Sequence, residues 1–459
     1  MTEAVTKPAP PMVPGLPLIG NIVDFARNPD SVFAEGYRAH GPVFGIQVGQ
    51  RRIAVLVGPD LHQFFFAETD KRLNISKPYV QLAAMFGQAG FLAPKEVYRD
   101  QHPVLYSPFK PEKMGRYVQV MQREVQRWLD SLGENGVMDI ATEMNQLVQE
   151  IAGYALMGDD FQRRMGRQFW NYYSELGQVF NVLIPPHWPL PNNIRRDQLK
   201  AKIRAMIEPV LEERRRNAGA YDDMLQQFLD TPTRSGQPAD NETVISLMMG
   251  LLFASHETTA GQAAWTIIEV LRDPAYQALL RAEIEQHLPL GTPLEARSMR
   301  SLEHVFWAVR EVERLHPSAN MLMRVADEPI DVGDYQIPAG WVVMVVASFA
   351  HRLPEIFSDP DRFDPLRFAP GREEDRKHGY TLIGFGGGRH KCAGMNFANN
   401  EMMAITAMLF QQFDLELLTP NPSTVFGKGA MRPSRTLIRY RRRNRPAALA
   451  DQPLAEAMA

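Results

Sequence analysis

The only cysteine of this 459-residue chain, Cys392, lies in a glycine-rich segment that constrains the fold more than any other stretch. The segment covers residues 385–394 and directly precedes a helical pattern over residues 395–413. Glycines let a backbone bend closely around a flat group, and amide N–H groups of a turn and a helix start can hold a sulfur as an anion. A lone thiolate cannot build a tetrahedral zinc site or an iron–sulfur cluster, but it can be the axial ligand of a haem iron. The alternative is a buried structural cysteine, because free cysteines are usually inert packing.

Composition and charge indicate an ordinary globular protein. Hydrophobic residues make up 45% of the chain and charged residues 22%, and the net charge of −3 does not favour nucleic-acid binding. A single cysteine excludes an intrachain disulfide, which fits a reducing cytoplasm. The apolar stretch 12–23 is interrupted by prolines and glycines, and later apolar runs are too short to span a bilayer. We therefore expect a soluble, cytoplasmic monomer without a transmembrane anchor.

The pattern along the chain predicts a mainly helical protein with few strands. An Asn-Pro-Asp start predicts a helix from residue 29, and Gly49-Gln50 predicts a hairpin between residues 43–48 and 53–57. Residues 75–94 and 352–382 are predicted to be irregular, and the basic run 439–443 is expected to be a solvated, frayed end. Further helices are predicted over residues 112–131, 144–157, 161–180, 195–216 and 241–273, followed by two more helices and a strand region at 335–346.

The predicted helix 241–273 is apolar on nearly every face, which is typical of a buried helix. In its middle stand Ser255, His256, Glu257 and Thr258, which are costly there unless they have partners. The Thr258 hydroxyl can bond to the carbonyl of Ala254 four residues earlier and bend the helix. Such an opening could hold water and a diatomic ligand. The alternative is a set of ordinary polar residues within a large core helix.

The cysteine segment resembles a known family. Phe385, Gly388, His390, Cys392 and Gly394 match F-x-x-G-x-[R/H]-x-C-x-G, the haem-binding signature of the cytochrome P-450 monooxygenases. The resemblance implies the fold of that family, mainly α with small β-sheets (an α+β fold), a triangular prism with haem b between two helices. It also implies one haem-thiolate domain over residues 1–445, with a small β-rich lobe near the N-terminus and a large α lobe, and a flexible tail over residues 446–459.

The resemblance also assigns roles to single residues. Cys392 would be the axial ligand of the haem iron, and Glu257 and Thr258 fall on the acid and alcohol positions of the oxygen-activation motif, which implies proton delivery to dioxygen. Glu311 and Arg314, three apart on one helix face, match E-x-x-R and would form a structural cluster with Arg367. Without the resemblance, Glu311 and Arg314 would be an ordinary surface salt bridge.

Two further sets surround the implied haem. The haem propionates would be held by cations and hydroxyls, with Phe385 also contacting the haem, and the alternative for each polar residue is an exposed side chain; the candidates are His390, Arg324, Tyr79, Arg99 and His102. The substrate pocket is mainly apolar and indicates a lipophilic substrate, although each member could instead be core; the candidates are Met85, Phe86, Phe91, Phe253, Ala254, Ala319, Met321, Leu322 and Met431.

An electron donor is implied because no flavin or nicotinamide domain is visible in the sequence. The resemblance implies electrons from NAD(P)H through a separate ferredoxin and reductase, with O2 as co-substrate. A basic patch on the thiolate side could dock an acidic ferredoxin, and the alternative is a solvated charged face; its candidates are Lys110, Lys113, Arg116, Arg123, Arg127, Arg389 and Lys391.

Within the family, the chain is similar to the bacterial, soluble sterol 14α-demethylase branch. The similarity rests on residues 253–256 with 265–269, on the loop from Tyr79 to Gly87, and on residues 368–376. That branch typically has His-Thr where this chain has Glu257 and Thr258. We therefore expect hydroxylation of a sterol, terpenoid or related lipophile. The alternatives are true sterol 14α-demethylation, a peroxide-driven oxygenase and a non-enzymatic haem-binding protein.

Overall fold

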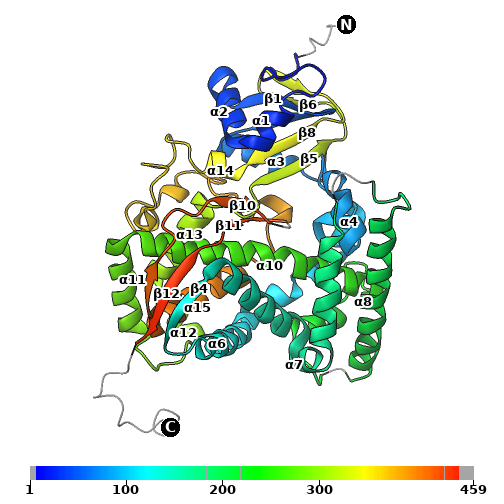
Figure 1. Ribbon diagram of the computed structural model, residues 1–459. Helices are drawn as coiled ribbons and strands as arrows, with labels where there is room; N and C mark the ends of the chain where they lie inside the picture. The colour runs from blue at the N-terminus through cyan, green and yellow to red at the C-terminus, as the bar shows by residue number, and fades with distance from the viewer. Residues whose placement is uncertain (1–6, 182–184, 218, 428, 444–459) are drawn as a thin grey trace.

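The computed structural model describes residues 7–181, 185–217, 219–427 and 429–443. As predicted, the fold is mainly helical with small sheets. A β-rich lobe contains the N-terminal region, and a larger helical body lies below it (Figure 1). The helices are α1 (Ile22–Arg27), α2 (Pro29–His40), α3 (Pro59–Glu68), α4 (Val80–Phe86), α5 (Lys95–Tyr106), α6 (Met114–Ser131), α7 (Ile140–Gln178), α8 (Pro191–Arg216), α9 (Met224–Asp230), α10 (Asn241–Arg272), α11 (Pro274–His287), α12 (Ala296–Met299), α13 (Glu303–Leu315), α14 (Ala347–Ala350) and α15 (Met395–Gln412).

The β-rich lobe is built on a five-stranded sheet in the order β1-β2-β8-β5-β3. The hairpin of β1 and β2 forms around Gly49 as predicted, and β2 pairs in parallel with β8, so distant parts of the chain meet there. The strands are β1 (Val43–Val48), β2 (Arg51–Leu56), β3 (Leu73–Asn74), β4 (Asn135–Asp139), β5 (Met321–Ala326), β6 (Ile330–Val332), β7 (Tyr335–Ile337), β8 (Val342–Val346), β9 (Phe413–Leu417), β10 (Thr424–Phe426), β11 (Met431–Pro433) and β12 (Leu437–Arg442).

Local sequence signals account for several helix boundaries. The start of α2 is capped by Asn28, whose side chain accepts a hydrogen bond from the backbone of Ser31, and Pro29 occupies the first helical position as predicted. The two predicted helices 144–157 and 161–180 are both present within α7, separated by a kink at Gly158 with φ of 82°. A Cβ atom at Gly158 would come within 2.2 Å of Asp223, so this kink needs glycine for space as well as conformation.

Two predictions about irregular chain are corrected by the structure. Residues 80–86 form the helix α4 within the predicted loop 75–94, because this short stretch has no glycine or proline and packs against α10. The basic run 439–443 is largely strand β12, which lies between β4 and β9 and is not frayed. Ile438 and Tyr440 are buried on one face whereas Arg439 and Arg441 are exposed, and this period of two belongs to a strand. Residues 446–459, the predicted tail, lie outside the described residues.

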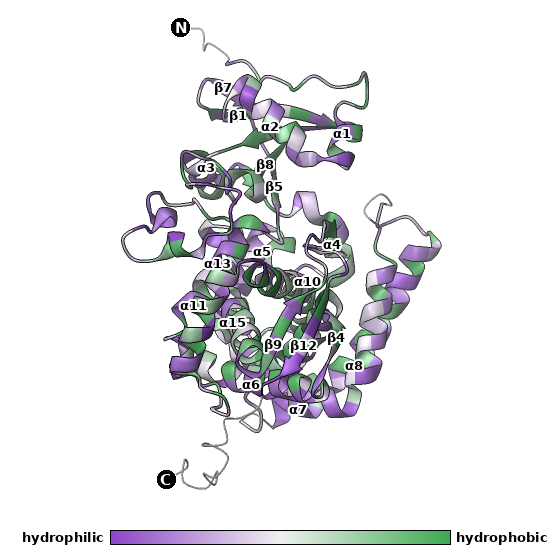
Figure 2. Cartoon of the chain, turned by 60° about the vertical axis from the view of Figure 1, so that its left-hand side comes forward, coloured by the Kyte–Doolittle hydropathy of each residue, from purple (hydrophilic) through white to green (hydrophobic). Residues whose placement is uncertain are grey.

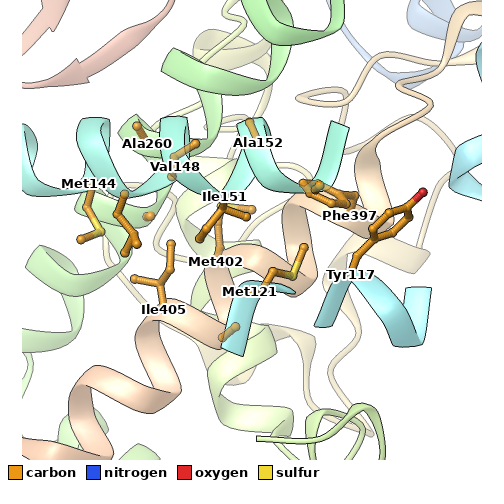
Figure 3. Packing of buried hydrophobic residues seen from close by; sticks show 14 of the residues in the cluster. Tyr117, Met121, Met144, Val148, Ile151, Ala152, Ala260, Phe397, Met402 and Ile405 are labelled. Carbon is orange, nitrogen blue, oxygen red and sulfur yellow. The ribbon is translucent and has the colours of Figure 1, made fainter. Parts of the chain in front are cut away.

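The core of the helical body is formed where α6, α7, α10 and α15 meet. Tyr117 and Met121 of α6, Ile151 of α7 and Phe397 of α15 lie close together there, as Figure 3 shows. In Figure 2 the turns of α10 in the interior are mainly hydrophobic, whereas α8 and α11 at the outside carry both hydrophilic and hydrophobic residues. None of the helices in the described ranges combines the length and apolar character needed to cross a bilayer.

Candidate active site

The loop that carries Cys392 depends on its glycines. Gly386 and Gly388 adopt φ values of 68° and 62°, and a Cβ atom at Gly387 would come within 2.8 Å of the Phe66 ring. The backbone N–H of Cys392 donates to the carbonyl of Phe385 at 2.9 Å, which closes the loop directly before α15 begins. The glycines therefore let the loop fold back on itself, which places Cys392 directly before the start of α15.

The Cys392 thiol lies in a deep but accessible place. The Cys392 side chain is exposed to solvent, although many protein atoms lie around its sulfur. Burial raises the pKa of this thiol to about 11, and a hydrogen bond from the backbone of Gly394 acts in the opposite direction. One amide therefore points at the sulfur as expected, but the protein alone does not make the anion. A positively charged partner such as a haem iron would stabilise the thiolate.

The oxygen-activation stretch of α10 has the predicted local distortion. The Thr258 hydroxyl donates to the carbonyl of Ala254 at 2.6 Å. Ala254 is the only exposed residue of α10 between residues 244 and 270. The Ser318 hydroxyl donates to the Thr258 carbonyl at 3.0 Å and accepts from Gln262 at 3.3 Å, so two residues that the sequence analysis did not name hold this turn in place.

Glu257, the predicted acid, has a buried oxygen without a partner. Its Oε2 atom makes no hydrogen bond within the described part of the chain. A Cβ atom at Gly427 would lie 2.8 Å from that oxygen, so the carboxylate faces the loop between β10 and β11. The neighbouring His256 points elsewhere, since its Nε2 atom lies 2.9 Å from the carbonyl of Asn145 on α7.

Two of the predicted propionate ligands, Arg324 and Tyr79, lie next to each other. Arg324 is only 4% exposed, yet it pairs with no carboxylate among the residues that the structure describes. Its guanidinium donates to the Thr69 hydroxyl and to the carbonyl of Met323, and burial lowers its pKa to about 10. The Tyr79 hydroxyl accepts from the backbone of Met323 at 3.1 Å, and burial raises its pKa.

The other candidates gather around Asp70, which the sequence analysis did not name. His390 Nε2 lies 2.9 Å from Asp70 Oδ2, and the side chains of both residues are 3% exposed. The Arg99 side chain lies near enough to act on the Asp70 carboxylate. His102 stacks on Tyr106 with ring centres 4.3 Å apart, and its pKa is lowered by burial and then by nearby cations. No local signal in the sequence links Asp70 to these residues.

The residues fit a haem group. His390 Nδ1 and Arg99 Nε are buried and lack hydrogen-bond partners within the described ranges. Together with Arg324 they form a set of donors near which the described residues place two carboxylates, Asp70 beside His390 and Glu96 beside Arg99, and Glu96 is largely exposed. Two propionates would satisfy that set. Cys392 would hold the iron, and the glycine turn would accept a flat ring.

The predicted cluster of Glu311, Arg314 and Arg367 is present and completely buried. Two nitrogens of Arg314 lie 2.8 Å from the two oxygens of Glu311, and Arg367 Nε lies 3.0 and 3.1 Å from the same oxygens. Arg367 also reaches Glu374 at 2.8 Å, which joins other donors in lowering the pKa of that carboxyl to about 2 against the effect of burial.

His351 connects this cluster to the cysteine loop. Its Nδ1 atom lies 3.2 Å from the carbonyl of Arg314, and its Nε2 atom accepts from the backbone N–H of Ile383 at 2.9 Å. The ring is fully buried, and burial lowers its pKa to about 3, so it is neutral. The expectation that the cluster supports the cysteine loop therefore has a visible contact, made by a histidine that the sequence analysis missed.

The predicted substrate residues divide between two parts of the molecule. Phe86 of α4 stacks on Phe253 of α10 with ring centres 4.5 Å apart, beside exposed Ala254, and Met85 is buried next to Phe86. Phe91 meets Tyr79 edge to face at 5.3 Å. In the second part, Ala319 is exposed, Met321 and Leu322 of β5 pack against different core clusters, and Met431 bonds through its backbone to Ser318.

The predicted basic patch is partly neutralised. Lys113 and Arg116 pair with Asp222, and Arg123 and Arg127 pair with Glu124. The remaining three cations are exposed and have no ion pair within the described residues; they are Lys110, Arg389 and Lys391. These three, which flank the cysteine loop in sequence or space, are the ones available to a negatively charged partner.

Comparison with known proteins decides the family. The sequence matches the cytochrome P450 family over residues 10–438. The chain belongs to the cytochrome P450 family. It is 31% identical over 91% of its length to the obtusifoliol 14-alpha demethylase of Sorghum bicolor, covering 87% of that protein. It is 28% identical over 93% of its length to the sterol 14alpha-demethylase of Mycolicibacterium vanbaalenii, covering 96% of that protein.

Solved P450 structures share the fold. A retinoic acid-bound cyanobacterial P450, CYP120A1, superposes with a TM-score of 0.83 at 23% identity, covering 95% of this chain and all of that one. The predictions of a P450 monooxygenase and of the P450 fold are thus confirmed. Membership of the family implies a haem and a redox partner, in agreement with the cysteine loop described above.

Proposed function

We propose that this P450 monooxygenase hydroxylates a lipophilic substrate of the sterol or terpenoid class. The observation that carries the proposal is the accessible stretch in the middle of the otherwise buried part of α10. There exposed Ala254 follows Phe253, whose ring stacks on Phe86, and the Ala254 carbonyl accepts from the Thr258 hydroxyl. An aromatic wall beside a positioned hydroxyl suits an apolar substrate and a reaction that needs protons. Relatives with sterol 14-demethylase names support the sterol part.

Each residue of the site has a proposed part. Cys392 would hold the iron of a bound haem, and the haem would supply the chemistry that activates dioxygen. Thr258, held by the Ala254 carbonyl and supported by Ser318, positions a hydroxyl beside the reaction site. Glu257 serves as the proton source. Arg324, Tyr79, Arg99, His102 and His390 hold the haem edge, and the aromatic wall excludes water from the substrate.

The electron donor is proposed to be a ferredoxin-type protein that receives electrons from NAD(P)H through a separate reductase. Lys110, Arg389 and Lys391 are exposed and lack ion pairs within the described residues. They are therefore free to form ion pairs with an acidic surface of the donor protein. We also propose that residues 1–445 act as one haem-thiolate domain, followed by a tail over residues 446–459.

A ligand screen with product analysis tests the function. Purified haem-loaded protein is titrated with sterols and terpenoids, and a spectral shift of the haem identifies the compounds that bind. Each of these compounds is then incubated with ferredoxin, reductase and NADPH. We expect a monohydroxylated product that carries oxygen from O2. Cys392→Ser should abolish the ferrous–CO band of thiolate ligation and the product together. Binding without product from any compound would contradict the proposal and favour a non-enzymatic haem protein.

True 14α-demethylation of a sterol is the second candidate, because it is named for the relatives that match nearly the whole chain. It predicts loss of the 14α-methyl carbon from obtusifoliol or lanosterol under the same conditions. Recovery of a hydroxylated sterol that retains all its carbons would favour the first candidate.

A further inference from the structure

The aromatic wall beside Ala254 contains a second unpartnered polar atom. Tyr173 of α7 contacts the Phe86 ring with centres 6.4 Å apart, and Phe86 stacks on Phe253. The Tyr173 hydroxyl is buried and makes no hydrogen bond to any residue that the structure describes. A buried hydroxyl without a partner destabilises the folded protein, so the fold retains this group at an energetic cost.

Glu257 Oε2 is the other unpartnered atom in this part of the molecule. It faces the loop after β10, where a Cβ atom at Gly427 would lie 2.8 Å away. The same loop reaches the aromatic wall, because a Cβ atom at Gly429 would lie 2.7 Å from the Phe253 ring. Elements α4, α7, α10 and the loop between β10 and β11 are therefore joined by a chain of contacts through Phe86 and Phe253, with Tyr173 at one end and Glu257 at the other.

The two groups are close enough to affect each other electrostatically. Burial raises the pKa of Tyr173, and the charge of Glu257 raises it further. Tyr173 is therefore a protonated hydroxyl, which can donate a hydrogen bond. A single donor in an otherwise aromatic wall complements an accepting oxygen on an apolar ligand, such as the oxygen of an alcohol.

We infer that the Tyr173 hydroxyl is a polar subsite that recognises a hydroxyl group on the lipophilic substrate. The inference rests on the proposed function and narrows its substrate class to alcohols, such as sterols and terpene alcohols, over the corresponding hydrocarbons. Tyr173 is the specificity-determining residue, and its hydroxyl would donate a hydrogen bond to the ligand oxygen. Glu257 keeps the proton-source role given above.

Matched ligand pairs test the subsite by spectral titration of the haem-loaded protein. The probes are 5α-cholestan-3β-ol with 5α-cholestane and farnesol with farnesene. In at least one pair, we expect the alcohol to bind about tenfold more tightly than the hydrocarbon, which is the worth of one well-placed hydrogen bond to a charged or buried group. Tyr173→Phe should reduce the preference to about twofold or less without weakening the hydrocarbon, as expected when only the hydroxyl contact is lost.

Tyr172→Phe is the matched control, because Tyr172 directly precedes Tyr173 on α7 but has partners of its own. Its hydroxyl accepts a hydrogen bond from Gln168, and its ring lies under Lys202. It should leave the preference unchanged. Equal affinity for both members of every pair, or no shift with any alcohol, would overturn the inference. If both members of every pair bind equally, the protein can still hydroxylate hydrocarbons, so failure of the subsite is distinguishable from failure of the proposed function. If Tyr173→Phe leaves the preference for alcohols unchanged but lowers the fraction of electrons that appears as product, the inference is overturned and Tyr173 is a proton relay.

Discussion

Two regions of this P450, the cluster around Glu311 and the stretch 254–258 of α10, differ in how completely their buried polar atoms form hydrogen bonds and ion pairs. Around Glu311, every carboxylate oxygen has an arginine partner, and the three charged side chains have no exposed surface. Along residues 254–258 of α10, Ala254 is exposed and Glu257 Oε2 has no partner within the described chain. A fully satisfied network rigidifies its surroundings. Unsatisfied buried atoms are kept where a ligand or a reaction uses them. The first region therefore supports the cysteine loop, and the second is where we propose that the chemistry takes place.

The largest expected effect is on the paired region. Glu311→Ala should lower the free energy of unfolding by about 3–5 kcal/mol, because it leaves buried Arg314 without a carboxylate and leaves buried Arg367 with Glu374 alone. Urea unfolding of the haem-loaded protein, followed by far-UV circular dichroism, measures the loss. Glu416→Ala is the control, since Glu416 pairs with Arg439 on the surface and should cost about 1 kcal/mol or less. Equal losses in the two variants would show that full pairing adds no stability here.

The neutral His351 ring predicts how the paired region responds to acid. Its pKa in the folded protein is about 3, below the ordinary value of 6.5. At pH values above 6.5 the His351 ring is neutral in both the folded and the unfolded state, so no stability is lost. As the pH falls below 6.5, the ring binds a proton in the unfolded state but stays neutral in the folded state. The wild type should therefore lose about 2 kcal/mol through this histidine between about pH 7 and pH 5.

Unfolding at a series of pH values tests this loss. His351→Gln should be less stable near neutral pH and should show a shallower decline on acidification, because its side chain does not titrate. The exposed His378 provides the control, and His378→Gln should follow the wild-type slope. Parallel slopes for His351→Gln and the wild type would mean that His351 does not sense acid in the folded protein.

In the unpaired region, function should change more than stability. Thr258→Ala should lower the fraction of consumed electrons that appears as product by about tenfold, because a positioned proton donor is lost, and should change the free energy of unfolding by about 1 kcal/mol or less. NADPH consumption and product are measured together. Thr266→Ala is matched, since Thr266 makes the same bond to the carbonyl four residues earlier on the same helix. A similar loss of coupling in Thr266→Ala would point to helix shape instead of the Thr258 hydroxyl.

The smallest effect is expected for Ser318→Ala. Ser318 donates to the Thr258 carbonyl and does not itself supply protons, so coupling should fall by only about twofold, and stability by about 1 kcal/mol, the worth of one hydrogen bond. The same coupling assay and a thermal melt measure both changes. Coupling as low as in Thr258→Ala would place Ser318 among the proton donors and blur the contrast between the two regions.

Contacts fixed by local spacing were determined by the sequence alone. The bond from Thr258 to Ala254 and the pairing of Glu311 with Arg314 follow from helix geometry, which brings residues three or four apart onto one face. The cap at Asn28 and the turn at Gly49 likewise depend on neighbours in the chain. The cysteine segment is equally local, because its glycines and its cysteine are consecutive.

Only the tertiary structure decided the partners that lie far apart in the chain. Asp70 meets His390, His351 meets Ile383, and Tyr173 reaches the wall that Phe86 and Phe253 build. The basic run at 439–442 became a strand because β4 and β9 offered it edges, whereas its charge alone predicted a solvated end. Such contacts depend on how whole elements pack, and no periodicity within a short stretch of sequence encodes which distant side chain will be brought to which buried atom.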